Sequence, residues 1–295
     1  MKTVGDMSLA VNFPGADSLY SDRLSQFIET PVNRVDIASL LPSGNSSGSS
    51  IVYPKENGTG EGGVATWTSG DKAQIDYDLL PVTAPWKTPA GVVIIDRFML
   101  DDIPFLTSWI QSRMLVSLIN ARNTLILNGD DTAPVLPGMQ DIASPYNGSF
   151  TGTTTTVAIK KLIDSAYGQI PDATQDMYRG NLIILNTRDQ VNLGLNTATG
   201  SGEFDLPAGS VAFSNGTLVI GGLKTVGIAA PTMPMGTFYS LDTNATMVVT
   251  RMQPELRMFD QPYARQNKIM FRIEQRLTVL FFNNAAIIKS VLFNS

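Results

Sequence analysis

The sequence predicts an α+β fold, and three observations support this prediction. A long helix is expected over residues 103–128, a stretch of short mixed helices and strands follows it, and residues 246–295 show the two-residue periodicity of β-strands. The chain has 295 residues, which is enough to bury a sizeable core in one or two domains.

The first 35 residues are weakly periodic and predict an extended arm with one short helix near 19–28. The run SGNSSGSS at 43–50 is flexible in composition. It fits a disordered linker and a loop within a folded domain about equally well.

Two strand-like runs around a glycine-rich tip predict a long hairpin over 51–80. IVY at 51–53 precedes ENGTGEGG at 56–63, and beyond the tip Ile75, Tyr77 and Leu79 alternate with polar residues. The glycines do not indicate a phosphate-binding loop, because no Gly-Lys-Ser/Thr follows them. A hairpin with so few core residues is expected to lie on another surface.

The predicted long helix has one apolar stripe, capped ends and two flanking pairs of aspartates. Asp101 or Asp102 is expected to cap its start, with Pro104 in the first turn, and Gly129 is expected to end it. Capping and turn formation explain Asp101–Asp102 and Asp130–Asp131 better than the alternative, a metal site. The stripe consists of Leu106, Ile110, Met114, Leu118, Ala121 and Leu125.

The rest of the chain predicts an inserted α+β region and closing strands. Lys160 and Lys161 are expected on the solvated face of a helix, and Gln275 is expected to mark a bulge, since it interrupts an apolar strand face. The expected elements are a helix at 157–169, a strand at 182–185, a helix from Thr187, a loop at 200–210, strands at 217–220, 223–229 and 237–240, a strand around 269–281 and a final strand at 285–293.

Composition excludes several classes of function. The chain has no cysteine and no histidine, which removes thiol nucleophiles, Ser-His and Cys-His pairs and Cys/His zinc sites. We therefore expect no enzyme activity and no cofactor. The net charge of −5 argues against general attraction to nucleic acid, and the lack of a long uncharged apolar run argues against a membrane span. Only 16% of residues are charged, so much surface is expected to be buried, in a core or against partner subunits.

After the N-terminal arm, five features in order carry a family resemblance over residues 35–293. The hairpin comes first, then TAPWKTPAGVVIIDRFMLDDIPFL, then a helix that ends in LILNGDDTAPVLPG. TLVIGGLKTVGIAAPTMPMGTFYSLD follows, and FRIEQRLTVLFFNNAAIIKSV closes the chain. In this order the sequence resembles the major capsid proteins of tailed bacteriophages, with the Hong Kong 97-like fold.

The resemblance implies a division of the chain and a structural role. Its parts would be an N-terminal arm at 1–35, a peripheral domain at 36–132 with the extended loop 51–80 and the spine helix 103–128, an axial domain at 133–245, and a return at 246–295 that completes the peripheral sheet. Pentamers and hexamers would form an icosahedral virion shell around double-stranded DNA, without sequence-specific binding, in the host cytoplasm.

The implied partners are a portal, a decoration protein and, if Met1 is the true start, a separate scaffolding protein. That last inference fails if the chain is a processed product. An encapsulin-like compartment would share the fold and is the alternative. A carboxylate-dependent enzyme is the alternative of another class, but no spacing of acidic residues selects a catalytic pair.

The resemblance also implies a set of interface residues on the extended loop: Lys55, Glu61, Trp67, Lys72 and Tyr77. Some family members form an isopeptide bond between a loop lysine and an asparagine of another subunit, with a glutamate as base. The matching positions here are Asn267, Glu274 and, slightly shifted, Lys72. The ordinary alternative is a turn asparagine, a strand-face ion pair of Glu274 with Arg276, and a loop-tip lysine.

Overall fold

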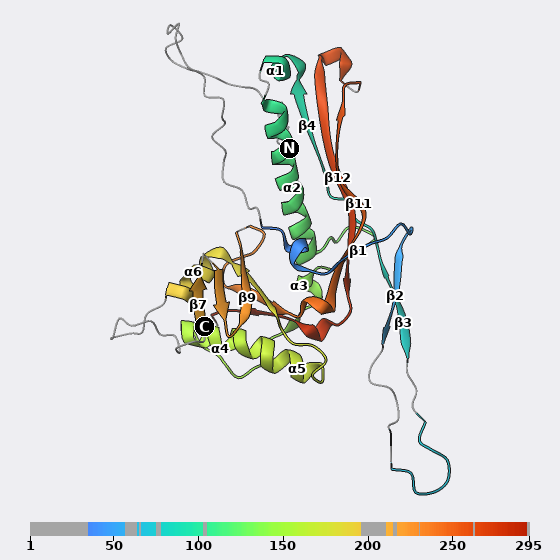
Figure 1. Cartoon of the computed structure of the whole chain (residues 1–295), viewed down its shortest axis with the longest axis vertical. Helices are drawn as coiled ribbons and strands as arrows, with labels where there is room; N and C mark the ends of the chain where they lie inside the picture. The colour runs from blue at the N-terminus through green and yellow to red at the C-terminus, as the bar shows by residue number, and fades with distance from the viewer. Residues whose placement is uncertain are drawn as a thin grey trace.

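Two sheets, a long helix and a projecting hairpin make up the fold (Figure 1). The computed structural model describes residues 35–56, 64, 66–74, 78–102, 105–195, 211–214, 217–229, 231–261 and 263–293. The helix expected near 19–28 and the loop expected at 200–210 lie outside these residues, as do Glu61 and Tyr77.

The first sheet has the strand order β1-β11-β12-β4. Its strands are β1 (Ser43–Asn45), β11 (Thr246–Phe259), β12 (Lys268–Phe281) and β4 (Ala90–Asp96). Because β1 pairs in parallel with β11, the run at 43–50 begins as part of the folded sheet rather than as a linker. The pairing of β11 with β12 is irregular opposite Gln275, and the extra residues belong to β11.

The long helix is preceded by a short one that was not predicted. Helix α1 covers Arg97–Asp102, and the Asp96 carboxylate accepts a hydrogen bond from the Phe98 N–H at 2.9 Å. Helix α2 covers Leu106–Asn128 and has no side-chain cap at Phe105, so the expected capping by Asp101 or Asp102 is wrong. The stop at Gly129 is confirmed: its φ is 73°, and its N–H donates to the Leu125 carbonyl at 3.0 Å.

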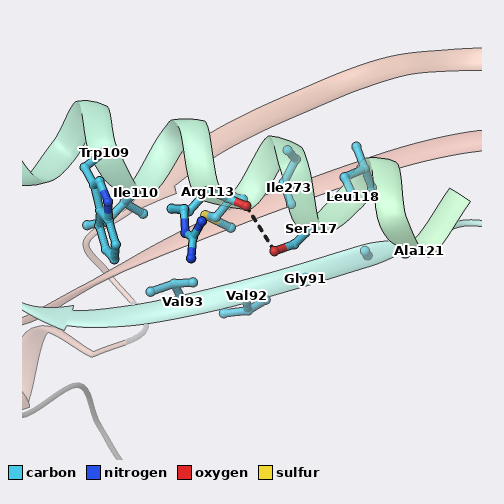
Figure 2. Close-up of a pocket in the computed structure, with 12 residues that line it drawn as sticks. Gly91, Val92, Val93, Trp109, Ile110, Arg113, Ser117, Leu118, Ala121 and Ile273 are labelled. Atoms are coloured by element: carbon cyan, nitrogen blue, oxygen red, sulfur yellow. Dashed lines mark hydrogen bonds between the residues drawn. The ribbon is translucent and has the colours of Figure 1, made fainter. Parts of the chain in front are cut away.

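The apolar stripe of α2 packs on the first sheet only as far as Leu118. Ala121 is exposed and Leu125 is only partly buried, so the predicted stripe is wrong in the last two turns. There Asn123, Ile126 and Leu127 are buried instead, because this end of α2 leaves the sheet and enters a second core. An apolar groove of about 330 Å³ lies between strand β4 and the part of α2 that precedes these last two turns (Figure 2).

The second sheet has the order β5-β13-β10-β6-β9-β8-β7. It confirms the strands predicted around 182–185, 217–220, 223–229 and 237–240 and the two predicted helices. Its strands are β5 (Ser144–Pro145), β6 (Leu182–Asn186), β7 (Val211–Ser214), β8 (Thr217–Ile220), β9 (Leu223–Ile228), β10 (Thr237–Leu241) and β13 (Ile287–Val291). The helices of this half of the chain are α3 (Met139–Ile142), α4 (Thr155–Asp164), a π-helical turn (Ser165–Gln169), α5 (Ile170–Ala173) and α6 (Thr187–Leu195).

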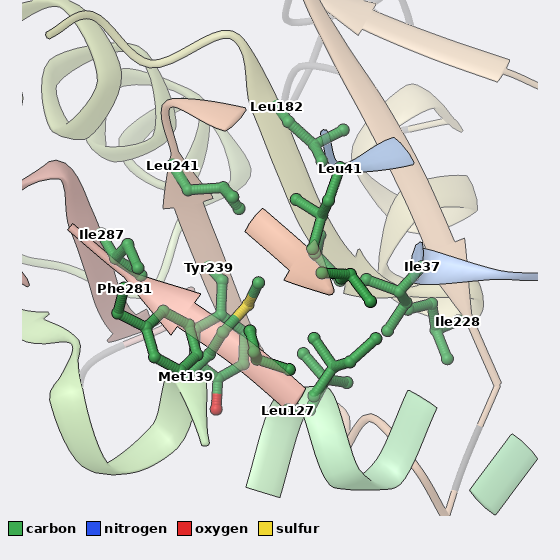
Figure 3. Packing of buried hydrophobic residues seen from close by; sticks show 14 of the residues in the cluster. Ile37, Leu41, Leu127, Met139, Leu182, Ile228, Tyr239, Leu241, Phe281 and Ile287 are labelled. Carbon is green, nitrogen blue, oxygen red and sulfur yellow. The ribbon is translucent and has the colours of Figure 1, made fainter. Parts of the chain in front are cut away.

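The C-terminal return divides between the sheets. Strands β11 and β12 belong to the first sheet, as expected, but β13 pairs with β10 and β5 of the second. The expectation that residues 246–295 complete only the peripheral sheet is therefore wrong for β13. A hydrophobic core joins the two halves at this point (Figure 3). It combines Ile37 and Leu127 with Leu182, Tyr239 and Phe281.

Lys161 corrects another expectation. Lys160 is exposed, but the side chain of Lys161 is fully buried. Its ammonium donates to the carbonyls of Val291 and Leu292, at 3.0 and 3.4 Å. Burial lowers the pKa of Lys161. This lysine thus ties α4 to the end of β13 instead of facing water.

Candidate subunit interface

The projecting hairpin consists of β2 (Ile51–Glu56) and β3 (Leu79–Ala84), which among the described strands pair only with each other. The second strand was predicted at 74–79 but begins at Leu79, and residues 75–77 lie outside the described part of the chain. A two-stranded sheet is marginal in water, so contacts at its base and along its faces must hold it.

The inner face of the hairpin is anchored on its own chain. The Tyr53 hydroxyl donates to the Phe281 carbonyl at 3.3 Å, and its ring meets Phe282 edge-on, with centroids 5.9 Å apart. The Lys55 ammonium donates to Asn284 Oδ1 at 3.2 Å. Of the predicted interface residues, Lys55 is therefore engaged within its own subunit, where it fixes the direction in which the hairpin leaves.

The outer face of the hairpin is largely apolar and exposed. The register places Val52, Pro54, Pro81 and Leu79 on this face, with Thr83 opposite Val52 and Glu56 opposite Leu79. Val52 and Leu79 expose 59% and 65% of their surface. Pro54 lies opposite Pro81, and neither has an N–H with which to extend the sheet. Exposed apolar side chains on a projecting hairpin are typical of a surface that a partner protein covers. We call Val52, Pro54, Pro81 and Leu79 the hairpin outer face.

Beyond β2 and β3, Trp67 and Lys72 lie in the described part of the loop and both are exposed. Trp67 exposes 57% of its surface, and its indole N–H donates to the Gly70 carbonyl at 2.8 Å. This bond orients the ring while leaving it accessible, which suits an aromatic anchor on a partner.

A charged surface covers the outer side of β11 and β12. Arg257 pairs with Glu255 at 2.6 Å and Arg272 with Glu274 at 3.0 Å, and the register aligns these pairs across the strands. The hydrogen bond that Arg257 donates to Glu255 raises the pKa of Arg257 above its ordinary value. The observed partner of Glu274 is thus Arg272, not the expected Arg276. We call this surface the arginine face; it comprises Arg257, Lys268, Arg272 and Arg276, with Glu255 and Glu274 among them.

The crosslink candidates lie far apart in one subunit. Asn267, with a φ of 54°, follows a 3₁₀ turn at the β11–β12 connection, and Glu274 lies seven residues further along β12, or about 23 Å away. The hairpin that contains Lys72 extends from the opposite end of the molecule (Figure 1). A bond of this kind would have to combine residues of different subunits.

The turn after α2 is tied to the base of the hairpin. The Lys87 ammonium forms an ion pair with Asp130 at 2.9 Å and donates to the Thr132 carbonyl at 2.6 Å. Asp130 also accepts from the Thr132 hydroxyl and N–H, which confirms its predicted turn role. These bonds, the Thr132 hydroxyl first and Lys87 next, lower the pKa of Asp130 from 3.8 to about 2.

We expect Asp130→Asn to lower the free energy of unfolding in a pH-dependent way. Because the folded pKa lies below the unfolded one, the contribution of Asp130 is present above about pH 4 and is lost as the pH falls through about 2. Thermal unfolding from pH 7 downwards should show the gap between wild type and variant narrowing below pH 4. Asp131→Asn, at an exposed neighbour, is the control, and a gap independent of pH would contradict this account.

Two side chains of α2, Asn123 and Arg122, bind residues 35–37, where the N-terminal arm joins the body of the subunit. We call this contact the clamp and residues 35–37 the stem of the arm; the sequence did not predict it. Asn123 Oδ1 accepts from the Ile37 N–H at 2.9 Å, and its amide donates to the Val35 carbonyl at 2.5 Å. Next to it, Arg122 pairs with Asp36 at 2.5 Å. Asn123 and Arg122 are polar residues that do not belong to the apolar stripe of α2, and their partners lie about 86 positions away in the chain. The local sequence pattern therefore does not indicate that they make this contact.

Comparison with known proteins decides the family. The model of the phage capsid family matches residues 15–292. The chain belongs to the phage capsid family. The major capsid protein of Enterobacteria phage HK97 is 28% identical over 283 residues, which cover 93% of this chain and 71% of that protein.

Solved phage structures agree with the fold of this capsid protein. A chain of Microbacterium phage Oxtober96 superposes with a TM-score of 0.71 at 14% identity, over 94% of this chain and 96% of that one. A chain from phage G, solved with major capsid and decoration proteins, has a TM-score of 0.68 at 10% identity, over 97% and 99%. The predicted Hong Kong 97-like α+β fold is confirmed, as is the prediction of a tailed-phage major capsid protein.

The capsid protein therefore has a structural role in a virion shell. Within the described residues, no helix is long and apolar enough to cross a membrane. In the same part of the chain, no group of three or more acidic side chains is placed to hold a metal ion.

Proposed function

We propose that this capsid protein assembles as pentamers and hexamers into an icosahedral shell around double-stranded DNA, in the host cytoplasm. The observation that carries the proposal is the exposed, apolar hairpin outer face, which projects from the body of the subunit. Covering Val52 and Leu79 with a neighbour would contribute about 1.5–3 kcal/mol for each side chain. Repeated between all subunits of a ring, such contacts would hold the shell together.

Charge identifies the neighbouring surface that would receive the loop. The loop between the two hairpin strands is acidic: Glu61, Asp71, Asp76 and Asp78 stand against Lys72 alone. On β11 and β12 the arginine face has the opposite balance, four cations against two glutamates, with Asp96 of β4 opposite Lys268. Complementary charge guides docking and sets its register. We therefore place the loop of one subunit across the arginine face of the next.

The remaining assignments stay part of the proposal. We retain the arm 1–35, the peripheral domain 36–132 and 246–295, except for β13, and the axial domain 133–245. The net charge of −5 fits DNA that is enclosed without a sequence-specific grip. A scaffolding protein, a portal and a decoration protein are the proposed partners, and the phage G relative was solved with decoration proteins.

A charge exchange between two subunits tests the placement of the loop. Asp76→Lys/Asp78→Lys in the loop, or Arg257→Glu/Arg276→Glu on the arginine face, should each lower the fraction of protein that sediments as shells by about tenfold, because like charges then meet across the contact. Combining both changes in one chain should restore much of the loss. Density-gradient sedimentation of the purified proteins gives this fraction.

The control is Asp172→Lys/Asp176→Lys, which makes the same charge change at two exposed aspartates in and just after α5. It should sediment like wild type. If the combined variant assembles no better than the weaker of its two parents, the loop does not lie on the arginine face.

The covalent crosslink of Lys72 with Asn267 needs a separate test. If the crosslink forms, denaturing electrophoresis of shells shows bands larger than the monomer.

A further inference from the structure

The groove between α2 and β4 is a second apolar surface, separate from the hairpin. Trp109, Ile110 and Leu118 of α2 form one wall, and Gly91 and Val93 of β4 form the other (Figure 2). Of the described residues that line it, Arg113 alone is charged. Since β4 is the end strand of the first sheet, the groove runs along an open edge. Its volume of about 330 Å³ can accept several apolar side chains.

The N-terminal arm meets α2 at the level of one end of this groove, but on the other side of the helix. Val35 is fixed to α2 through its hydrogen bond with Asn123. Ala121, which is exposed and lines the groove, lies two residues before Asn123, about 3 Å along the helix axis and about 200° around it. The chain before Val35 must therefore pass around the helix, over about 10 Å, to enter the groove. Residues 29–34 can span up to about 20 Å when extended. The preceding segment can therefore reach the groove of its own subunit.

The sequence of that segment suits an apolar groove. In LYSDRLSQFI at 19–28, Tyr20, Leu24 and Phe27 recur at i, i+4 and i+7 and would form one stripe of a helix. Ten helical residues are about 15 Å long, and the groove follows α2 from Trp109 to Ala121, or about 18 Å. The lengths match, and the polar residues between the stripe positions would face water.

We propose that residues 19–28 form an amphipathic helix that packs into the α2–β4 groove of the same subunit. This contact covers the open edge of the first sheet and makes the arm part of the folded subunit. It does not depend on shell assembly, so it can be tested on subunits before they assemble.

A cysteine pair tests the proposal cleanly, because the chain contains no cysteine of its own. In Gln26→Cys/Ala121→Cys, both thiols would lie at the rim of the filled groove. Treating unassembled subunits with a short bismaleimide should give a crosslink within the monomer, found by mass spectrometry of the digest. We expect roughly tenfold more of it than in the control Gln26→Cys/Leu115→Cys, because a docked segment has a high effective concentration.

Leu115 suits the control, because it is exposed on α2 and does not line the groove. Adding Phe27→Asp to the test pair should remove the crosslink, whereas adding Ser25→Asp should leave it. Equal yields in the test and control pairs would overturn the proposal. So would a crosslink found only between two subunits, because the groove would then hold a neighbour's arm.

Discussion

Val52→Asp/Leu79→Asp abolishes shell formation and leaves the subunit folded. Both side chains lie on the hairpin outer face and are more than half exposed in the single chain. Their loss removes about 3–6 kcal/mol from each contact between neighbours, and it adds two charges to a surface that assembly should dehydrate. Because such a contact would recur between neighbouring subunits throughout the shell, even the lower value is enough to prevent closed shells.

The measurement is electron microscopy of the purified variant, together with its circular dichroism and melting temperature. Val52→Ile/Leu79→Met is the matched control, since it keeps both positions apolar and should still form shells. Shells of normal number and size from the aspartate variant would show that the hairpin outer face is not an assembly contact.

Asn123→Ala lowers the free energy of unfolding of the subunit by about 2–4 kcal/mol. The substitution leaves the buried Ile37 N–H and the Val35 carbonyl without their side-chain partner, and each such group costs about 1–3 kcal/mol. The fully buried position leaves little room for water to replace the amide. We also expect the arm to be held less firmly, because Val35 loses its hydrogen bond to α2 while the Arg122–Asp36 ion pair remains.

Urea unfolding of unassembled subunits gives the change in free energy. Thr124→Ala changes an exposed neighbour on the same helix and should stay within about 0.5 kcal/mol of wild type. A loss below about 1 kcal/mol for Asn123→Ala would mean that water or a shifted backbone satisfies these groups. The clamp would then not fix the direction of the arm.

Local patterns were enough to predict most elements. The stripe of α2 as far as Leu118, the stop at Gly129 and the fully buried strand β6 follow from spacing and turn residues. Helix α1 was missed because Asp101 resembled a cap, whereas the capping carboxylate belongs to Asp96. Strand β1 was ambiguous because its serine and glycine composition gives no strand signal. It is ordered by pairing with β11, more than 200 residues later.

The site could be predicted less completely, because its important contacts join distant parts of the chain. The hairpin was evident from its two strand-like runs, but not that Lys55 would be held by Asn284. Nothing near Lys161 in the sequence indicates that the carbonyls of Val291 and Leu292 bury its ammonium. The ion pair of Lys87 with Asp130 likewise depends on the path of the chain between them.

The most direct test of the central claim is a reconstruction of the assembled particle by electron cryo-microscopy. The account requires closed shells in which the loop between β2 and β3 leaves its own subunit and lies across β11 and β12 of a neighbour. Density for this loop folded back on its own subunit would contradict the account, as would a protein that stays monomeric under every assembly condition.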